Sequence, residues 1–295
     1  MTNIPYKLRD WIPLDKLDWN RLSKNPNAIQ LLEENQDKIN WVALNMNPNA
    51  IQLLEQNPDK INWEWFSDNT NSVHFLEKNL DKVDLYWLSY NPNAVRLLEQ
   101  NPDKIDWSAL SFNPNAIHLL EQNPDRIAWK YLSGNPNAVH LLEQNPDRIE
   151  WKWLSGNPNA VHILERNQDR ITWDWLSMNP NAVHLLEKNQ DKIDWDLFLQ
   201  NKSPNIIPII EKIMDKLDDT DWFYLSGNPV AIDLLKENQD KISWEHLSKN
   251  PAIFVYDYDA MRESHKDLKE ELIQVAWHPM RVQKWLDDGL DLEDM

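Results

Sequence analysis

The sequence contains no cysteine, only four glycines and no long apolar run. The lack of cysteine excludes disulfide frameworks, thiolate zinc sites and thiol nucleophiles, and it fits a reducing intracellular compartment. So few glycines leave little material for flexible linkers, which favours an ordered chain. The first residues lack the apolar core of a signal peptide, and no run of about 18 apolar residues follows, so we expect neither secretion nor a membrane span.

Basic residues are scarce relative to acidic ones. Lysine and arginine number 30 against 48 aspartates and glutamates, which gives a formal net charge of -18. This charge disfavours a phosphate backbone as the main partner, although a protein that reads one base per repeat would have suitable modularity. We therefore expect a protein partner and no nucleic acid.

The chain is rich in one repeated pattern. Tryptophan recurs at multiples of 22 residues, at Trp19, Trp41, Trp63, Trp107, Trp129, Trp151, Trp173 and Trp195, with Leu85 in the fourth unit; after a longer step the series resumes at Trp222 and Trp244. Each copy reads approximately Asp-Trp-x-x-Leu-Ser-x-Asn-Pro-Asn-Ala-Val-x-Leu-Leu-Glu-x-Asn-Pro-Asp-Lys-Ile. A faithful period of this length is typical of solenoid proteins.

Each unit predicts two short helices. Helix A begins after Asn25, which can cap it, and Pro26, which suits its first turn; it ends near Asn35, a residue type that tolerates a left-handed backbone. Helix B begins at the tryptophan, and its Trp19 and Leu22 share one face. Helices this short are stable only when neighbouring units stack, so a continuous core of Trp, Leu and Ile must hold the array together.

We therefore predict an all-α protein, a right-handed α-solenoid of tandem two-helix repeats on the order of 100 Å long, whose caps cover the apolar faces of the end units. The predicted organisation is an N-terminal cap (1–18) that contains a half-unit, eight regular repeats (19–194), an irregular repeat with an insertion (195–221), two further repeats (222–253) and a C-terminal helical cap with an acidic tail (254–295). The C-terminal cap should contain a helix at 259–276 and a shorter one at 280–286. The extra residues and prolines of 196–221 predict a bend, a bulge or a joint.

The face of helix B opposite the core is the first candidate surface. Two residues after the core position it carries an aromatic series, consisting of Trp65, Trp87, Tyr131, Trp153, Trp175 and Tyr224. Neighbouring positions vary from unit to unit, and variation over a constant framework is typical of a modular recognition surface with Trp and Tyr anchors. The alternative is that these rings pack across adjacent repeats and complete a thin core. The solvent accessibility of Trp153 and Trp175 distinguishes the two.

A histidine row on helix A is the second candidate surface. It consists of His74, His118, His140, His162 and His184. The position points away from the Ala-Leu-Leu face of the helix, so these rings should be exposed. Stacked units hold them about 8–10 Å apart, too far to share a zinc ion, whose ligands lie about 2 Å from it. The row is either a solvated polar face or a strip whose partner binding depends on pH.

Asparagines and paired charges recur in nearly every unit and are expected to be structural. One asparagine, such as Asn135, caps helix A; others, such as Asn137 and Asn145, would bond to the loop backbone of the next unit as a ladder. The carboxylates beside Arg148 and Arg170 repeat without any irregularity that would form a pocket, which favours surface ion pairs over acid-base catalysis. We expect no enzyme, with no catalytic, cofactor-binding or metal-ligating residues.

Two segments resemble a known family. Units such as WKYLSGNPNAVHLLEQNPDRI and the closing KNPAIFVYDYDAM…LKEELIQVAWHPMRVQKW, with its His278-Pro279-Met280-Arg281 tetrapeptide, are similar to short α-helical tandem-repeat proteins of giant DNA viruses of the mimivirus and phycodnavirus type. The resemblance covers nearly the whole chain and brings no activity with it. It implies an uncharacterised interaction or structural role in infected cells or virions.

These observations lead to two hypotheses of function. The first is a monomeric, non-enzymatic scaffold for protein-protein interaction, located in the host cytoplasm or the virion, which binds a viral or host protein along one face of the solenoid. The alternative is a structural component of the virion or its assembly, which associates with itself or with capsid proteins.

Overall fold

The computed structural model describes residues 5–264 and 266, which belong to two compact units. The terminal unit combines both ends of the chain, Met1–Leu8 and Phe254–Met295, and the repeat domain comprises Arg9–Ile253. The described residues are mostly helical, with two strands of three residues each, which confirms the all-α class. The helix predicted at 280–286, most of that at 259–276, the His278 tetrapeptide and the acidic tail lie outside the described residues.

The repeat domain alternates two sets of α-helices. The B helices are α1 (Trp19–Leu22), α3 (Trp41–Leu44), α5 (Trp63–Asp68), α7 (Leu85–Tyr90), α9 (Trp107–Phe112), α11 (Trp129–Leu132), α13 (Trp151–Ser155), α15 (Trp173–Ser177), α17 (Trp195–Phe198), α19 (Asp219–Ser226) and α21 (Trp244–Ser248). The A helices are α2 (Ile29–Glu33), α4 (Ile51–Gln56), α6 (Val73–Leu76), α8 (Val95–Gln100), α10 (Ile117–Gln122), α12 (Val139–Gln144), α14 (Val161–Arg166), α16 (Val183–Glu187), α18 (Ile207–Glu211) and α20 (Ile232–Glu237).

Short 3-10 helices occupy most of the connections. They are η1 (Leu14–Lys16), η2 (Pro26–Ala28), η3 (Gln36–Lys38), η4 (Pro58–Lys60), η5 (Pro102–Lys104), η6 (Pro124–Arg126), η7 (Pro146–Arg148), η8 (Gln168–Arg170), η9 (Gln190–Lys192), η10 (Pro204–Ile206), η11 (Met214–Lys216), η12 (Pro229–Ala231) and η13 (Pro251–Ile253). Most begin at proline, whose fixed φ and missing N–H suit the first residue of a helical turn.

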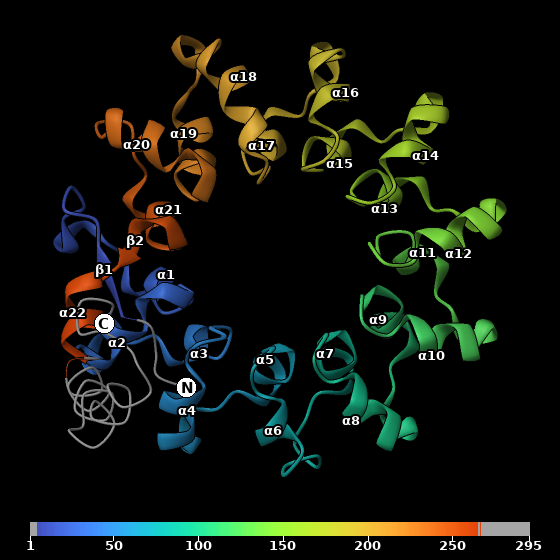
Figure 1. Cartoon of the computed structure of the whole chain (residues 1–295), viewed down its shortest axis with the longest axis horizontal. Helices are drawn as coiled ribbons and strands as arrows, with labels where there is room; N and C mark the ends of the chain where they lie inside the picture. The colour runs from blue at the N-terminus through green and yellow to red at the C-terminus, as the bar shows by residue number, and fades with distance from the viewer. Residues whose placement is uncertain (1–4, 265, 267–295) are drawn as a thin grey trace, which may run out of the picture. The chain divides into compact units, whose positions relative to one another are not determined.

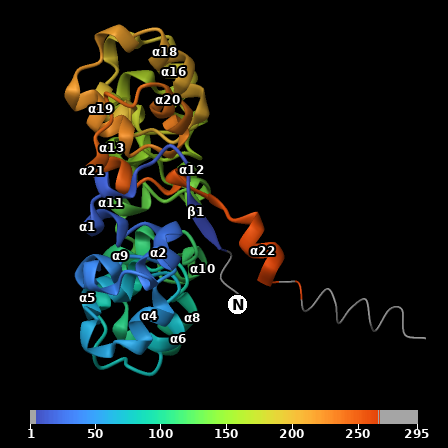
Figure 2. The same cartoon turned by 90° about the vertical axis from the view of Figure 1, so that its left-hand side faces the viewer.

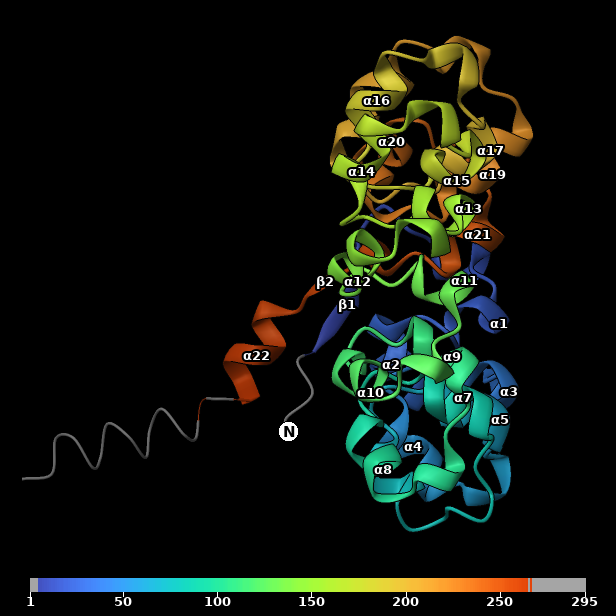
Figure 3. The same ribbon diagram turned by 90° about the vertical axis from the view of Figure 1, so that its right-hand side faces the viewer.

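The two sets of helices form two concentric circles within the repeat domain. Figure 1 shows the B helices on the inner circle and the A helices on the outer circle. From the side, the B helices lie along one edge of the repeat domain and the A helices along the other (Figures 2 and 3). The B helices pack side by side along the chain, as α5 does against α7 and α7 against α9.

Local chemistry sets where the helices begin and end. Before α5, the side chain of Asn62 accepts a hydrogen bond from the backbone N–H of Trp65, which is the expected capping interaction. The A helices are shorter than predicted: the side chain of Asn157 caps the turn that precedes α14, not α14 itself. The asparagine after helix A does not adopt the expected left-handed backbone; Asn167 has φ −135° and ψ 52°, and its Nδ2 donates to the carbonyl of Ile163.

The core lies between the A and B helices. In most units its completely buried members are the alanine and second leucine of the A segment and the leucine of the B helix, as in Ala160, Leu164 and Leu154; Phe66 and Phe198 replace the leucine in α5 and α17. The repeated tryptophans lie at the edge of this core: apart from Trp222, which is 4% exposed, they are half-buried. A cation from the same unit covers several of these indoles at 4.4–5.9 Å from the ring centre, in the pairs Lys38–Trp19, Lys82–Trp63, Arg148–Trp129, Arg170–Trp151 and Lys192–Trp173.

A buried asparagine links each unit to the unit before it. Its Nδ2 donates to two backbone carbonyls of the preceding unit at 2.8–3.1 Å; Asn157, for example, donates to the carbonyls of Ser133 and Asn135. Its Oδ1 caps the local turn, so the whole amide is satisfied. The members of this asparagine ladder are Asn25, Asn47, Asn69, Asn91, Asn113, Asn135, Asn157, Asn179, Asn201, Asn228 and Asn250, all at most 4% exposed. A ladder was predicted, but from other asparagines and toward the next unit: the capping asparagine forms it and bonds to the preceding unit, Asn137 adds an exposed bond to Pro114 of that unit, and Asn145 bonds to Leu141 of its own helix.

The ladder closes on itself, so the predicted rod with two capped ends is wrong. Helix α1 packs against α21, and Asn25 Nδ2 donates to the carbonyls of Ser248 and Asn250 at 3.1 and 3.0 Å. The hydroxyl of Ser248 accepts the backbone N–H of Asp18, as the serine at this position of the regular units accepts from the next unit; Asn45 does the same with its Oδ1. The repeat domain is therefore a closed ring, and its first and last units cover each other's stacking faces.

The N-terminal half-unit completes the last repeat. Residues 9–18 supply the part that follows helix B elsewhere: Ile12 and Leu17 are buried, and Lys16 lies 4.8 Å from the ring centre of Trp244. Arg9 donates from Nε to the carbonyl of Ala252 at 2.7 Å. The eleventh unit is thus assembled from both ends of the repeat domain, so residues from before α1 and residues from after α21 both contribute to the closing interface.

The insertion at 196–221 does not interrupt the ladder. Asn228 donates to the carbonyls of Leu199 and Asn201, a separation of 27 residues where 22 is usual for the second bond. The extra residues lie in the turn after Asn201 and in the first turn of α19, which Asp218 caps in place of the expected Asp221. The unit is enlarged locally, and the ring continues through it.

The terminal unit pairs the two ends of the chain. Strands β1 (Tyr6–Leu8) and β2 (Phe254–Tyr256) are antiparallel, with Tyr6 opposite Tyr256 and Leu8 opposite Phe254. Helix α22 (Tyr258–Ser264) follows, and the side chain of Asp257 caps it.

The asparagine at the ring closure makes the same pair of bonds as an internal one, so both should contribute equally to stability. We expect Asn25→Ala and Asn157→Ala each to lower the free energy of unfolding by about 3 kcal/mol, because both leave buried carbonyls without a donor. Guanidinium denaturation followed by tryptophan fluorescence measures this. Asn159→Ala, which removes an exposed bond to the carbonyl of Pro136, should cost about 1 kcal/mol or less. A loss at Asn157 with none at Asn25 would show that α1 and α21 do not meet.

Candidate interaction surface

Aromatic side chains form a continuous band over the inner helices from α5 to α15. Their ring centres follow one another at 5.0–6.0 Å in the order Trp65, Trp87, Tyr90, Phe112, Trp153 and Trp175, and Tyr131 joins at Trp153. Offset and edge contacts at this spacing are the favoured arrangements of aromatic pairs. We call these seven residues the aromatic band.

The band contains most of the aromatic residues predicted from the sequence. It brings Trp65 and Trp87 together, and it unites Tyr131 with Trp153 and Trp175. It does not include Tyr224, whose ring contact is with Phe223 in α19.

Two members, Tyr90 and Phe112, come from the variable position that neighbours the aromatic series, which the sequence indicates as part of the same surface. Each is the last residue of its B helix, and Tyr90 lies three residues after Trp87, where side chains on a helix meet. This spacing was the available signal.

The rings of the band pack across units and also remain partly exposed. All seven are half-buried, so they have features of both alternatives: packing across adjacent repeats and an exposed recognition surface. Glycine permits the close approach at α11 and α13: a Cβ at Gly134 would lie 2.8 Å from the ring of Phe112 and 3.1 Å from that of Trp153, and one at Gly156 would lie 3.1 Å from Trp175.

Charge is distributed unevenly along the band. At the α11–α13 end, Lys130 lies 5.4 Å from the ring centre of Tyr131, and Lys152 lies 5.5 Å from that of Trp175. At the α5 end, Asp68 follows Trp65 by one helical turn, and burial raises the pKa of its carboxyl. The band therefore presents cations at one end and a desolvated carboxylate at the other.

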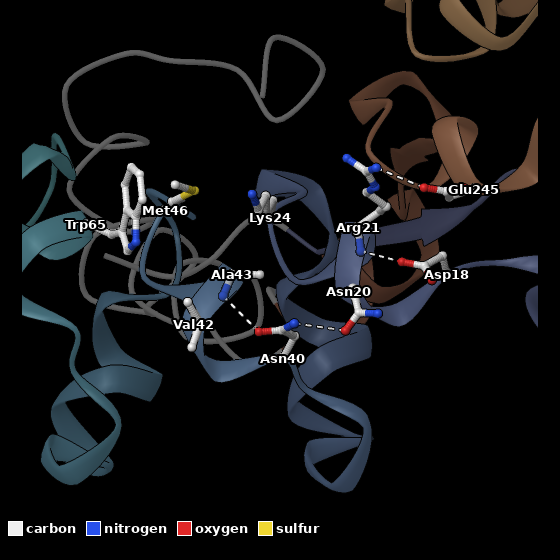
Figure 4. Close-up of a pocket in the computed structure, with 10 residues that line it drawn as sticks. All are labelled: Asp18, Asn20, Arg21, Lys24, Asn40, Val42, Ala43, Met46, Trp65 and Glu245. Atoms are coloured by element: carbon white, nitrogen blue, oxygen red, sulfur yellow. Dashed lines mark hydrogen bonds and ion pairs between the residues drawn. The ribbon is translucent and has the colours of Figure 1, made fainter.

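A pocket of about 440 Å³ adjoins the α5 end of the band and lies beside the ring closure (Figure 4). Its walls come from α1, α3, α5 and α21, with Trp65 and Met46 on one side and Arg21 and Glu245 on the other. Arg21 donates to Glu245 at 2.8 Å, so one wall depends on the ring being closed. This pocket could not be predicted from the sequence, because α1 and α21 lie more than 200 residues apart.

A buried histidine lies at the closing interface. His246 in α21 is 6% exposed, its ring centre is 3.5 Å from that of Phe223, and its Nδ1 has no hydrogen-bond partner among the residues that the structure describes. Burial, with the positive charges of Lys249 and Arg21, lowers the pKa of His246 to about 4, against an opposing effect of Glu245. Burial, and then Arg21, also lowers the pKa of Lys249.

The predicted histidine row forms a polar seam on the A helices. Every ring is exposed or half-buried, and its Nε2 pairs with a glutamate of the preceding A helix at 2.6–2.9 Å. The pairs are His74–Glu55, His118–Glu99, His140–Glu121, His162–Glu143 and His184–Glu165. The seam is separate from the aromatic band, since the two lie on different sets of helices.

Other kinds of site are not found in the described part of the chain. No group of three or more potential ligands is placed to hold a metal ion among residues 5–264 and 266. Within the same residues no helix is long and apolar enough to cross a membrane. No family model, curated protein or solved structure matches this chain.

The buried histidine predicts acid sensitivity. In the unfolded chain His246 takes up a proton as the pH falls below about 6.5, whereas in the folded protein it stays neutral to about pH 4, so its contribution destabilises the fold between these values. On going from pH 7 to 4.5, the free energy of unfolding should fall by about 2 kcal/mol less in His246→Phe than in the native protein. Tyrosine or tryptophan fills this position in other units, so an aromatic ring suits it. Denaturation series at both pH values measure the difference, and an equal loss in both proteins would contradict a neutral His246.

Proposed function

We propose that this protein is a non-enzymatic scaffold that binds another protein along the aromatic band. The observation that carries the proposal is that seven rings in contact with one another remain partly exposed on the B helices of α5–α15. Tryptophan and tyrosine are the residues most often found as anchors of protein interfaces. A half-buried ring is held in place before binding, so it loses little conformational entropy on contact.

The fold itself does not require these aromatic side chains. At the same position of the B helix, α3 carries Ala43 and α9 carries Ala109, yet the asparagine ladder passes through both units. The frame is thus supplied by the buried leucines and asparagines, while the ring-bearing positions are free to vary. This separation supports a role in recognition beyond packing.

Further properties belong to the same proposal. The net charge of -18 favours a protein over nucleic acid as the partner. We propose a monomer with right-handed stacking of its units, and the resemblance to giant-virus repeat proteins supports a place in infected cells or virions. A partner protein would contact the B helices of the ring with an extended segment or with a convex surface.

Pull-down with quantitative mass spectrometry tests the proposal. We expect proteins retained by the native chain to be reduced about tenfold or more by the double variant Trp153→Ala/Trp175→Ala, because two central anchors are lost. Alanine already occupies this position in other units, so the variant should remain folded, and circular dichroism checks that it does.

A matched change on the outer circle serves as the control. His140→Gln/His162→Gln places the side chain found in other units on the polar seam, and it should retain the same partners. Loss of the partners in the glutamine variant but not in the alanine variant would place binding on the seam and contradict the proposal. Comparison of binding at pH 5.5 and 8 separately tests the predicted pH dependence of the histidine row.

A further inference from the structure

The α5 end of the aromatic band differs from the rest. Trp65 and Trp87 lie with ring centres 5.4 Å apart and their planes tilted by 42°. Tyr86 and Tyr90 stand edge-on to Trp87, at 5.2 and 6.0 Å. Asp68 is one turn after Trp65 in α5, so it lies on the same side of that helix. We call these five residues the acidic aromatic cluster.

Asp68 has no partner within the described part of the chain. Its side chain is half-buried and makes neither an ion pair nor a hydrogen bond there. Burial raises the pKa of Asp68, and its charge contributes to raising the pKa of Tyr90 after the larger effect of burial. The carboxylate also ends α5, where the free backbone carbonyls already carry partial negative charge. At neutral pH the ionised side chain therefore weakens the fold, and a cation placed beside it would relieve this cost.

The rings of the cluster also lack a cation. Elsewhere in the repeat domain, lysines and arginines lie over tryptophans, and within the band itself Lys152 covers Trp175 and Lys130 covers Tyr131. No such contact falls on Trp65 or Trp87 in the described residues. At this end of the band the paired tryptophans have a neighbouring carboxylate and, in the described residues, no cation over their rings; Lys24 and Arg21 line the pocket that adjoins Trp65, and Arg21 is paired with Glu245.

We propose that the acidic aromatic cluster receives a lysine or arginine side chain of the bound protein, whose cation lies over Trp65 and Trp87 and pairs with Asp68. Aromatic rings and a carboxylate together attract a cation more strongly than either alone, since the ring faces are negative and the site is partly desolvated. The exposed carboxylate of Glu64 adds to the attraction from the neighbouring position. The inference rests on the proposed function and names the chemistry of the partner at this end of the band.

A small probe tests the site apart from any whole partner. The tripeptide acetyl-Gly-Lys-Gly-amide is titrated into the full chain while the indole N–H signals of Trp65 and Trp87 are followed by NMR. The same tripeptide with norleucine in place of lysine keeps the shape and lacks the charge. We expect saturable shifts of both signals with the lysine peptide at millimolar concentration, and no saturation with the norleucine peptide.

Two variants and one control define the contributions. Asp68→Asn and Trp87→Leu should each weaken lysine-peptide binding at least about fivefold, since each removes one half of the attraction. Leucine occupies the equivalent position in α17 as Leu197, so Trp87→Leu is compatible with the fold. Asp59→Asn removes the same charge from η4 of the preceding unit, where Asp59 pairs with Lys60, and it should leave binding unchanged.

The stability of Asp68→Asn separates a site from a structural carboxylate. At pH 7 the variant should be as stable as the native protein or more so, because a desolvated charge is removed. Equal binding of the lysine and norleucine peptides, or an equal loss in Asp68→Asn and Asp59→Asn, would overturn the proposal. Partners that are captured through Trp153 and Trp175 but are indifferent to Asp68→Asn would overturn this inference and leave the proposed function in place.

Discussion

One buried amide per unit carries the architecture. The side chain of each ladder asparagine caps its own turn and donates to two carbonyls of the unit before it, so local and neighbouring backbone are fixed by the same group. Short helices with so little apolar surface of their own depend on such links. A buried amide must also keep all its bonds, which allows each unit only one position against the next. Repeated around the repeat domain, this constraint leads the chain back to its beginning.

Closure divides the work of the chain between two sets of positions. Leucines, alanines, serines and asparagines at buried positions make every interface alike, including the one between α21 and α1. The positions of the B helices that do not face the core are then free to differ. They carry aromatic rings in one region and lysines in another, and at the closure they line the pocket beside Arg21. A ring has no end unit to protect, so the N-terminal half-unit can serve the last repeat in place of a cap.

The sequence predicted the helical class, the capping residues and the aromatic series, because each depends on local spacing. It did not predict closure, since the turn from one unit to the next is small and only its sum over the domain brings α1 to α21. The half-unit at residues 9–18 was the available signal, and it was interpreted as a cap. The tryptophans were expected inside the core, yet lysines and arginines of the same unit cover them at its edge. Asp68 lies at the variable position beside the aromatic series; its particular role could not be predicted, because that role depends on rings from the next unit.

The distance between α1 and α21 tests this account most directly. The chain has no cysteine, so Asn20→Cys/Glu245→Cys can carry two spin labels at exposed positions on either side of the closure. Pulsed electron paramagnetic resonance should show a single distribution below about 25 Å, as expected for neighbouring helices about 8–10 Å apart with flexible labels. An open array would separate the labels by on the order of 100 Å, and the absence of a short distance would contradict a closed ring.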